Sequence, residues 1–333
     1  MELKDYDESF LFESNEEQQK EEMSFLNKKT KNQDGIYRPS LSDVTDQKVG
    51  YRAKIRFLRN LTRDGKVGPA SIEKHQHYVA HGPFDSQSKL IGYYDCERNH
   101  KDKCELCTVY WKLKKSKNQA DNERAELIDR NTKYYSYVMI LEDIQQPKVV
   151  GKIRVFPYGY TIKEKINGEN TGEVSGNPCN VFDFANGKDF MLIIREKKTS
   201  NGTFPNYDSS QFLDVSPLKI YSPEKEKFFT VQLDENGEIT DPVWQQKIKQ
   251  ALLSRDENVN VEDHKAKEDW TYEQRENVSK IISILNGEDI EYAESAVKQV
   301  RNTTPSIKKQ PNSTSAVEDD FDFLFDKEDD EKS

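Results

Sequence analysis

The sequence predicts a mainly β protein with added helices, whose core is an open Greek-key barrel of the OB-fold type. Several short strand-like segments separated by glycine turns follow one another between residues 50 and 215, without a βαβ rhythm. Three of the four cysteines lie close together among these segments, which predicts a zinc-binding subdomain within the core. From about Pro223 onward the apolar spacing becomes helical, around residues 241–254 and 270–286.

These patterns divide the chain into five predicted units. The first is polar and charged, and the last two lack the apolar residues needed for a core. The units are an N-terminal arm (1–45), a core (46–222) with the zinc subdomain at about 75–130, a helical region (223–301), a flexible linker (302–317) and a disordered acidic tail (318–333).

Charge is distributed unevenly along the chain. The net charge is -10, but residues 46–225 carry 30 Lys and Arg against 23 Asp and Glu, and the rest of the chain carries 20 against 37. A basic middle suits nucleic acid, and acidic ends would repel it or compete for the same cationic surface. The N-terminus lacks a signal-peptide pattern, and no stretch approaches the roughly 18 apolar residues that span a bilayer. We therefore expect a soluble intracellular protein with no membrane partner.

The three clustered cysteines have the spacing C-x7-C-x2-C at Cys96, Cys104 and Cys107. Two thiolates separated by two residues can turn onto one tetrahedral ion, and a third thiolate with one imidazole would complete the ligand set. Such a closed set leaves no position for water, so we predict one structural Zn2+. The alternatives are a disulfide or three ordinary buried thiols. Cys179 is expected to be a small buried hydrophobe.

Several histidines could supply the fourth ligand. We predict His81, because it precedes Gly82-Pro83 and can leave a strand with a sharp turn toward the cysteine loop. The other nearby histidines in the sequence are His75, His77 and His100.

Basic and aromatic side chains share one face of several predicted strands. Arg52, Lys54 and Arg56 alternate with apolar residues, so they lie on one face. Every even position of residues 152–160 is basic or aromatic. Rings on a strand offer platforms for unpaired bases, and neighbouring cations hold phosphates. The alternative for 152–160 is a two-sided core strand with a polar edge.

A further strand is predicted at residues 130–141, where Tyr135 and Tyr137 share one face and Tyr134 lies on the other; the sequence does not settle which face is core. A basic helix at 105–117 and a basic-aromatic loop at 197–207 complete the predicted interface. The candidate DNA-binding side chains are Arg52, Lys54, Arg56, Lys112, Lys114, Arg130, Lys133, Tyr134, Tyr135, Tyr137, Lys152, Arg154, Phe156, Tyr158, Lys197, Lys198, Phe204 and Tyr207.

Both ends of the chain carry candidate interaction segments. The arm contains a basic cluster, Lys28, Lys29 and Lys31, which would serve self-interaction unless the arm is a leader without a role. The tail holds nine acids and two lysines, and it is too charged to fold alone. Four apolar side chains within it would give a partner something to bind: Phe321, Phe323, Leu324 and Phe325.

These segments together resemble the T-even-type bacteriophage single-stranded DNA-binding, or helix-destabilising, proteins. The resemblance covers roughly residues 50–215. His81-Gly82 with the three cysteines looks like that family's zinc ligand set, and residues 130–135 and 151–159 look like its DNA-cleft strands. Residues 204–213 are similar to its later cleft loop.

The resemblance implies a function. It implies cooperative, sequence-tolerant coating of single-stranded DNA in the host cytoplasm, during phage DNA replication, recombination and repair. It also implies that the acidic tail recruits replication and recombination proteins: a polymerase, a helicase loader and a recombinase mediator.

Enzymatic readings fit the sequence poorly. Zinc nucleotide deaminases place a proline directly before C-x2-C, whereas position 103 here is lysine. The sequence has no glycine-rich phosphate loop ending in GK[ST], which disfavours ATP-driven unwinding. We therefore expect no enzymatic activity. The alternative function is a zinc-ribbon factor that binds duplex DNA or protein.

Overall fold

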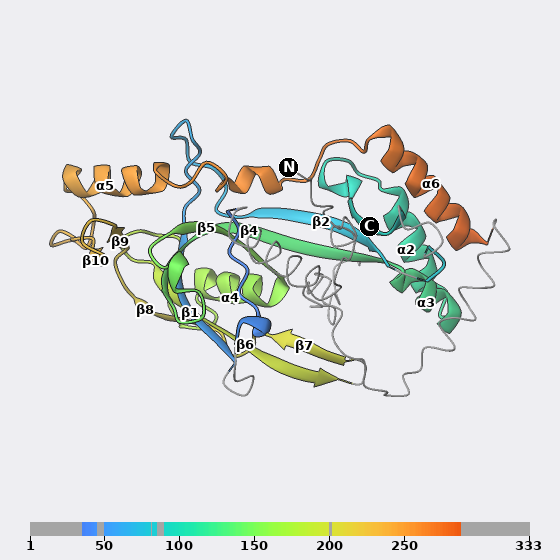
Figure 1. Ribbon diagram of the computed structural model, residues 1–333, viewed down its shortest axis with the longest axis horizontal. Helices are drawn as coiled ribbons and strands as arrows, with labels where there is room; N and C mark the ends of the chain where they lie inside the picture. Colours follow the sequence, from blue (N-terminus) through green and yellow to red (C-terminus); the bar gives the residue numbers. More distant parts are fainter. Residues whose placement is uncertain (1–34, 45–49, 81, 85–89, 200–201, 288–333) are drawn as a thin grey trace, which may run out of the picture.

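The computed structural model describes residues 35–44, 50–80, 82–84, 90–199 and 202–287 (Figure 1). The basic cluster of the predicted arm and the whole of the predicted linker and tail lie outside the described residues. No helix within the described ranges has the length and apolar character needed to span a membrane.

An eight-stranded antiparallel sheet forms the framework. Its strand order is β3-β2-β4-β1-β6-β7, with β5 also paired to β4 and β8 to β6. Among the described residues these pairings form a sheet. They do not include a pairing that closes it into the predicted OB barrel. The strands are β1 (Tyr51–Leu58), β2 (Ile72–Val79), β3 (Gly92–Asp95), β4 (Ile128–Asp143), β5 (Ile153–Tyr158), β6 (Lys188–Thr199), β7 (Gly202–Asn206) and β8 (Gln211–Val215).

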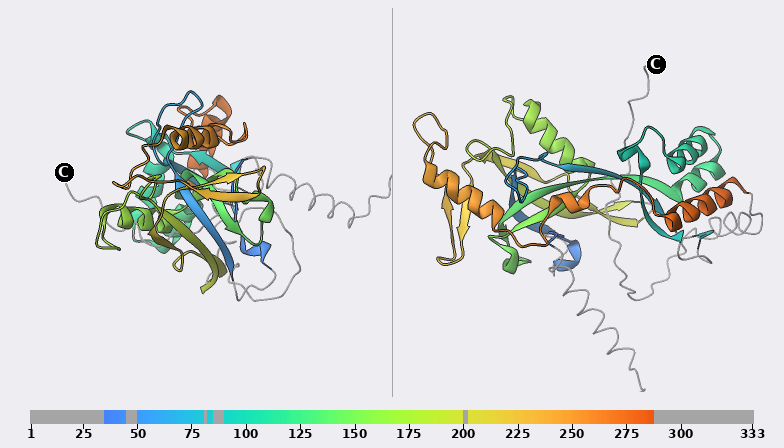
Figure 2. Two further views of the ribbon diagram at one scale, coloured as in Figure 1. Left: turned by 90° about the vertical axis from the view of Figure 1, so that its left-hand side faces the viewer. Right: turned by 90° about the horizontal axis from the view of Figure 1, so that it is seen from above.

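Helices and a small hairpin surround this sheet (Figures 1 and 2). The C-terminal helical prediction is confirmed by α5 and α6, but the sequence analysis did not predict the preceding two-stranded sheet of β9 (Lys219–Ser222) and β10 (Lys227–Thr230). The helices are α2 (Glu105–Lys115), α3 (Gln119–Glu126), α4 (Tyr160–Thr171), α5 (Pro242–Leu253) and α6 (Tyr272–Asn286), with short 3-10 turns η2 (Leu41–Asp43), η4 (Glu97–Asn99), η5 (Pro147–Val149) and η6 (Val261–His264).

Strand β4 connects the parts of the molecule. It is 16 residues long; its first half pairs with β2 and its second half with β1, while β5 pairs with its middle on the other edge. Because side chains alternate along a strand, Tyr134 and Val138 point to one layer and Tyr135 and Tyr137 to the opposite layer. The predicted alternation is confirmed, and both faces are core.

Three apolar clusters follow from this arrangement. The central core lies between β1, β4, β5, β6 and α4, and contains Phe57, Phe156 and Phe190. The outer core lies between the opposite face of β4 and β5 and the segment from α5 to η6. The metal core joins β2, β3, α2 and α6 around Cys96, Cys104 and Cys107. Each functional feature below is positioned by one of these cores.

Candidate metal centre and nucleic-acid interface

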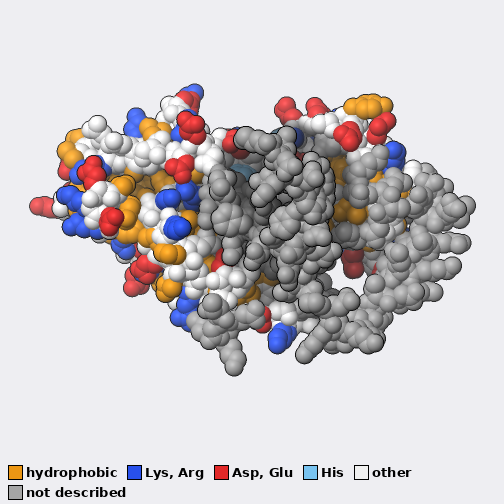
Figure 3. All heavy atoms as spheres, viewed as in Figure 1, with side chains coloured by type: hydrophobic (Ala, Val, Ile, Leu, Met, Phe, Trp, Pro, Cys, Tyr) orange, Lys and Arg blue, Asp and Glu red, His pale blue; other side chains and the backbone are white. Residues whose placement is uncertain are grey.

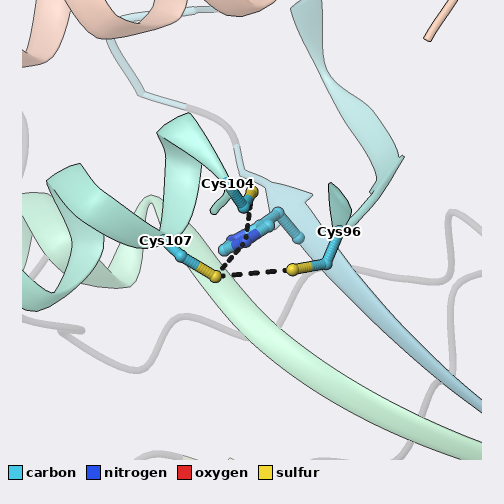
Figure 4. A group of neighbouring side chains, drawn as sticks. Cys96, Cys104 and Cys107 are labelled. Atoms are coloured by element: carbon cyan, nitrogen blue, oxygen red, sulfur yellow. Dashed lines mark hydrogen bonds between the residues drawn. The ribbon is translucent and has the colours of Figure 1, made fainter. Parts of the chain in front are cut away.

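Four buried side chains in the metal core converge on one point. They are His77 from β2, Cys96 directly after β3, Cys104 at the N-cap of α2 and Cys107 in its first turn. Figure 4 shows the three thiols pointing toward one another. The sulfur of Cys107 lies 3.3 Å from Nε2 of His77 and 3.4 Å from the sulfur of Cys96, and the sulfur of Cys104 lies 3.8 Å from the same Nε2.

Strand pairing explains how the sequence brings these residues together. In the β2–β3 ladder His77 is opposite Tyr94, so Cys96 follows two residues beyond the histidine's partner. Asn99 then fastens the loop, because its side-chain amide donates to the carbonyl of His75 at 2.9 Å and accepts from the backbone N–H of His75 at 2.9 Å. The first turn of α2 supplies the remaining two thiols.

Among the described residues the histidine that joins this cluster is His77, and the predicted His81 lies outside the described residues. The alternation of β2 gives the reason. His77 and Val79 point into the metal core and are fully buried, whereas Tyr78 on the opposite face is half-buried. No turn after the strand is needed to bring an imidazole to the cysteines, because His77 already points toward them from within β2.

The geometry of the cluster fits a tetrahedral metal ion. With zinc bond lengths of about 2.3 Å to sulfur and about 2.0 Å to nitrogen, ligand atoms of one ion lie about 3.5–3.8 Å apart. The four ligand atoms lie within 4.8 Å of one another. Nδ1–H of His77 donates to the carbonyl of Ile128 at 3.2 Å, which leaves Nε2 available as the ligand. These residues could hold a metal, and three sulfurs with one nitrogen are typical of a structural zinc site.

Electrostatics within the cluster favour the ionised thiol that a metal requires. Hydrogen bonds from Cys107 and Cys96 hold the pKa of the Cys104 thiol well below its usual range. Hydrogen bonds to Cys104 and Cys96, with burial, raise the pKa of the Cys107 thiol. Burial lowers the pKa of His77, but hydrogen bonds to Cys104 and Cys96 outweigh it and raise the pKa to about 9. The cluster therefore favours an ionised Cys104, the form in which a thiol binds a metal.

Burial removes part of the predicted DNA interface. Phe156 and Tyr158 are each 2% exposed and lie in the central core, and Tyr134, Tyr135 and Tyr137 are also buried. The prediction that the even positions of residues 152–160 face solvent is therefore wrong at these rings. The alternative, a two-sided core strand, is confirmed, because apolar layers cover both faces of β5. Tyr135 is also stacked flat on His264, with ring centroids 4.6 Å apart.

Two predicted cations are likewise internal. Arg56 is 0% exposed, and its guanidinium reaches Asp189 at 3.2 Å and the carbonyls of Asp183 and Ser216. Arg154 is 6% exposed and pairs with Asp256 at 3.0 Å. The prediction of an outward-facing position is wrong for both arginines, because each guanidinium forms an ion pair with a carboxylate at the edge of a core.

The remaining predicted residues reach solvent. Lys54 forms an ion pair with Glu142, and Lys114 lies near Glu126. The exposed side chains are Arg52, Lys112, Lys152, Lys197 and Lys198, and the half-buried ones are Lys54, Lys114, Arg130, Lys133, Phe204 and Tyr207. In the β6–β7 hairpin Lys197 is directly opposite Phe204, so a cation and a ring share one face.

Two rings beside the predicted Lys133, on the same sheet, were not among the residues predicted from the sequence. Tyr78 and Tyr93 are cross-strand neighbours with ring centroids 4.9 Å apart, and Nζ of Lys133 lies 5.3 Å from the centroid of Tyr93. Both tyrosines are half-buried and thus accessible. We call Tyr78, Tyr93 and Lys133 the stacking cluster. The alternation of side chains along β2 and β3 could have identified both tyrosines. Tyr78 alternates with the buried His77 and Val79, and Tyr93 alternates with the buried Tyr94.

Comparison with known proteins decides the family. Residues 51–269, more than half of the chain, match the family described as gp32 DNA binding protein like. The chain belongs to this gp32-like family. The predicted resemblance is confirmed, and the match is to a binding protein and not to an enzyme, as expected.

Two relatives of this gp32-like chain are phage proteins. It is 27% identical over 197 residues to the single-stranded DNA-binding protein of Enterobacteria phage T4. The aligned region covers 57% of this chain and 60% of that protein. It is 26% identical over 197 residues to the single-stranded DNA-binding protein of Enterobacteria phage T2, which covers 57% of this chain and 59% of that protein. The match thus spans less than two thirds of either relative.

Proposed function

We propose that this protein binds single-stranded DNA without sequence specificity. The family membership supports the nucleic acid, and the stacking cluster is the observation that favours unpaired bases. Two accessible rings with a cation over one of them can stack a base and hold its phosphate, whereas duplex readers place a few polar side chains on a groove-entering helix. The accessible rings therefore favour the single strand over the alternative of a zinc-ribbon factor for duplex DNA or protein.

The proposed interface combines the stacking cluster with residues predicted from the sequence that reach solvent on the same sheet. Lys133 of β4 is already part of that cluster, and Lys197 and Phe204 share one face of the β6–β7 hairpin. The end of the molecule formed by α5, β9 and β10 is a poorer candidate, because its basic and acidic side chains are interspersed (Figure 3). A protein surface on which positive and negative charges alternate would hold phosphates weakly.

We also propose that the cluster of His77 and the three cysteines binds one structural Zn2+. The ion would fix β2, β3 and α2 relative to one another, and β2 and β3 carry both tyrosines of the stacking cluster. A closed ligand set supplies no catalytic water, so its contribution is rigidity of the sheet that meets DNA.

Cooperativity and partner recruitment complete the proposal. The basic residues of the arm would contact a neighbouring copy on the strand, and the acidic tail would bind replication and recombination proteins through its four apolar side chains. Such a protein would protect single strands and remove their secondary structure during phage DNA replication, recombination and repair in the host cytoplasm.

Substitutions in the stacking cluster test the interface. Tyr93→Leu should weaken binding of a poly-thymidine oligonucleotide by about 1–3 kcal/mol, the value of one stacked base. Lys133→Met should lower the slope of log affinity against log salt by about 0.7, the value of one phosphate contact on a single strand. Fluorescence anisotropy at several salt concentrations measures both.

Matched controls come from α6, where Tyr272 is 79% exposed and Lys280 is exposed. Tyr272→Leu and Lys280→Met remove the same groups from a different surface and should leave affinity and salt slope unchanged. Equal losses at the two surfaces, or no loss at Tyr93 and Lys133, would refute the proposed interface.

A further inference from the structure

The segment that ends in α6 binds the cysteine loop of the candidate metal centre next to Cys96, the first of the three cysteines. Indole Nε1–H of Trp270 donates to the carbonyl of Asp95 at 2.7 Å, and the backbone N–H of Lys267 donates to the Asp95 carboxylate at 2.9 Å. Asp95 directly precedes the ligand Cys96. These two bonds therefore fix the backbone from which Cys96 enters the metal core.

The same segment contacts the middle of that loop, between Cys96 and Cys104. Nε2 of His100 lies 2.8 Å from the carbonyl of Ala266, and Nζ of Lys101 lies 2.7 Å from the carboxylate of Asp269. The loop between two of the ligands is therefore attached to a segment about 170 residues away in sequence.

Helix α6 then covers the metal core from outside. Its residues Val278 and Ile281 are fully buried, and Ile284 and Leu285 nearly so, in the same apolar cluster as the three cysteines. α6 lies beside α2 in Figures 1 and 2. Thr271 and Gln274 form a capping box at its start, so the helix begins at a defined position next to Trp270. The family match ends at residue 269, so Trp270 and α6 lie beyond it.

We propose that residues 266–286, which we call the C-terminal clamp, retain the metal by keeping the cysteine loop closed. This inference rests on the proposed Zn2+ site. A chelator can remove the ion only after ligands leave it, and Cys96 and Cys104 can move apart only if the loop between them opens. The clamp opposes that opening through the bonds to Asp95, His100 and Lys101 and through the apolar cover of α6. It therefore acts on the rate of metal release without contacting the ion.

Zinc release from the full-length, zinc-loaded protein tests the clamp. The protein is mixed with excess EDTA, and the remaining protein-bound zinc is measured over time after rapid desalting. Ile281→Asp, which places a charge under α6, should release zinc at least about tenfold faster, because loss of groups that support metal ligands costs roughly tenfold or more in metal affinity. Trp270→Phe keeps the aromatic ring but removes the bond to Asp95, and it should release zinc faster by a smaller factor.

Ile248→Asp is the matched control, because Ile248 is similarly buried on α5 but packs in the outer core. Its release rate should stay within about twofold of the wild type. Far-UV circular dichroism of each zinc-loaded variant verifies that it is folded, and Trp270→Phe keeps the test decisive if Ile281→Asp does not fold. Release from Trp270→Phe and Ile281→Asp no faster than from Ile248→Asp would overturn the clamp alone. A wild-type protein that binds no zinc would refute the metal centre, and the clamp with it.

Discussion

At the scale of single residues, His77 shows how strand alternation selects a ligand. The imidazole points into the metal core because its neighbours on β2 alternate, and its Nδ1–H is already held by the carbonyl of Ile128. The sequence offered four nearby histidines, and turn chemistry favoured His81. The three thiols were predictable from their spacing, but the register of the β2–β3 ladder, which chooses the histidine, depends on pairing between distant segments.

Substitution of the two histidines separates these readings. His77→Ala should abolish stoichiometric zinc binding, because three thiols alone leave the tetrahedral set incomplete. His81→Ala should keep one zinc per chain. Inductively coupled plasma mass spectrometry of the desalted proteins gives the ratio of zinc to chain. Zinc retained by His77→Ala but lost by His81→Ala would identify His81 as the ligand, as predicted from the sequence.

Arg56 gives a second prediction at this scale. It is fully buried, and removal of its charge would leave Asp189 with Lys219, at 3.1 Å, as its one ion-pair partner among the described residues. Arg56→Met should lower the free energy of unfolding by about 3 kcal/mol, typical of a broken buried pair. Arg59 is exposed and pairs with Asp183, so Arg59→Met should cost less than about 1 kcal/mol. Urea denaturation measures both, and equal losses would contradict the structural role of Arg56.

At the scale of elements, the turn between β4 and β5 makes a demand that only glycine meets. Gly151 has φ +80°, and a Cβ there would lie 2.4 Å from the ring of Tyr221 on β9. Gly151→Ala should therefore destabilise the protein by about 2–4 kcal/mol, the sum of left-handed strain and overpacking. Gly176 has φ +77°, but within the described part of the chain no atom beyond its two chain neighbours lies within 4 Å of the corresponding position. Gly176→Ala should lose only about 1 kcal/mol in the same urea titration, and similar losses at the two sites would show that the contact with Tyr221 is unimportant.

Strand β5 shows why elements were easier to predict than their surroundings. Period-two alternation located the strand and separated its two sets of side chains. The basic and aromatic set was assigned to solvent because the opposite set was apolar. The structure places a core on each side, because the α5–η6 segment covers the odd positions while α4 and β1 enclose the even ones. A sequence pattern reports which side chains share a face, and only the fold decides what covers that face.

At the scale of the whole molecule, the acidic tail and the basic middle of the chain should oppose each other. Residues 318–333 carry nine acids against two lysines. Deletion of these residues should tighten binding of single-stranded DNA at low salt, because a competing polyanion is removed, and the gain should shrink as salt screens the charges.

A second variant isolates the charge. Replacement of Phe321, Phe323, Leu324 and Phe325 by alanine keeps all nine acids, so its DNA affinity should equal that of the full-length protein. A deletion that binds no more tightly than the full chain at low salt would rule out competition by the tail.

Preference for unpaired DNA is the central property of the proposed function. The most direct measurement is a titration of the zinc-loaded protein with a poly-thymidine oligonucleotide and, separately, with a duplex of equal length, followed by quenching of intrinsic tyrosine fluorescence. We predict strong quenching by the single strand, reduced in Tyr93→Leu, and weak quenching by the duplex. Equal or preferential binding of the duplex, or binding of neither, would contradict the account and favour a zinc-bearing interaction module instead.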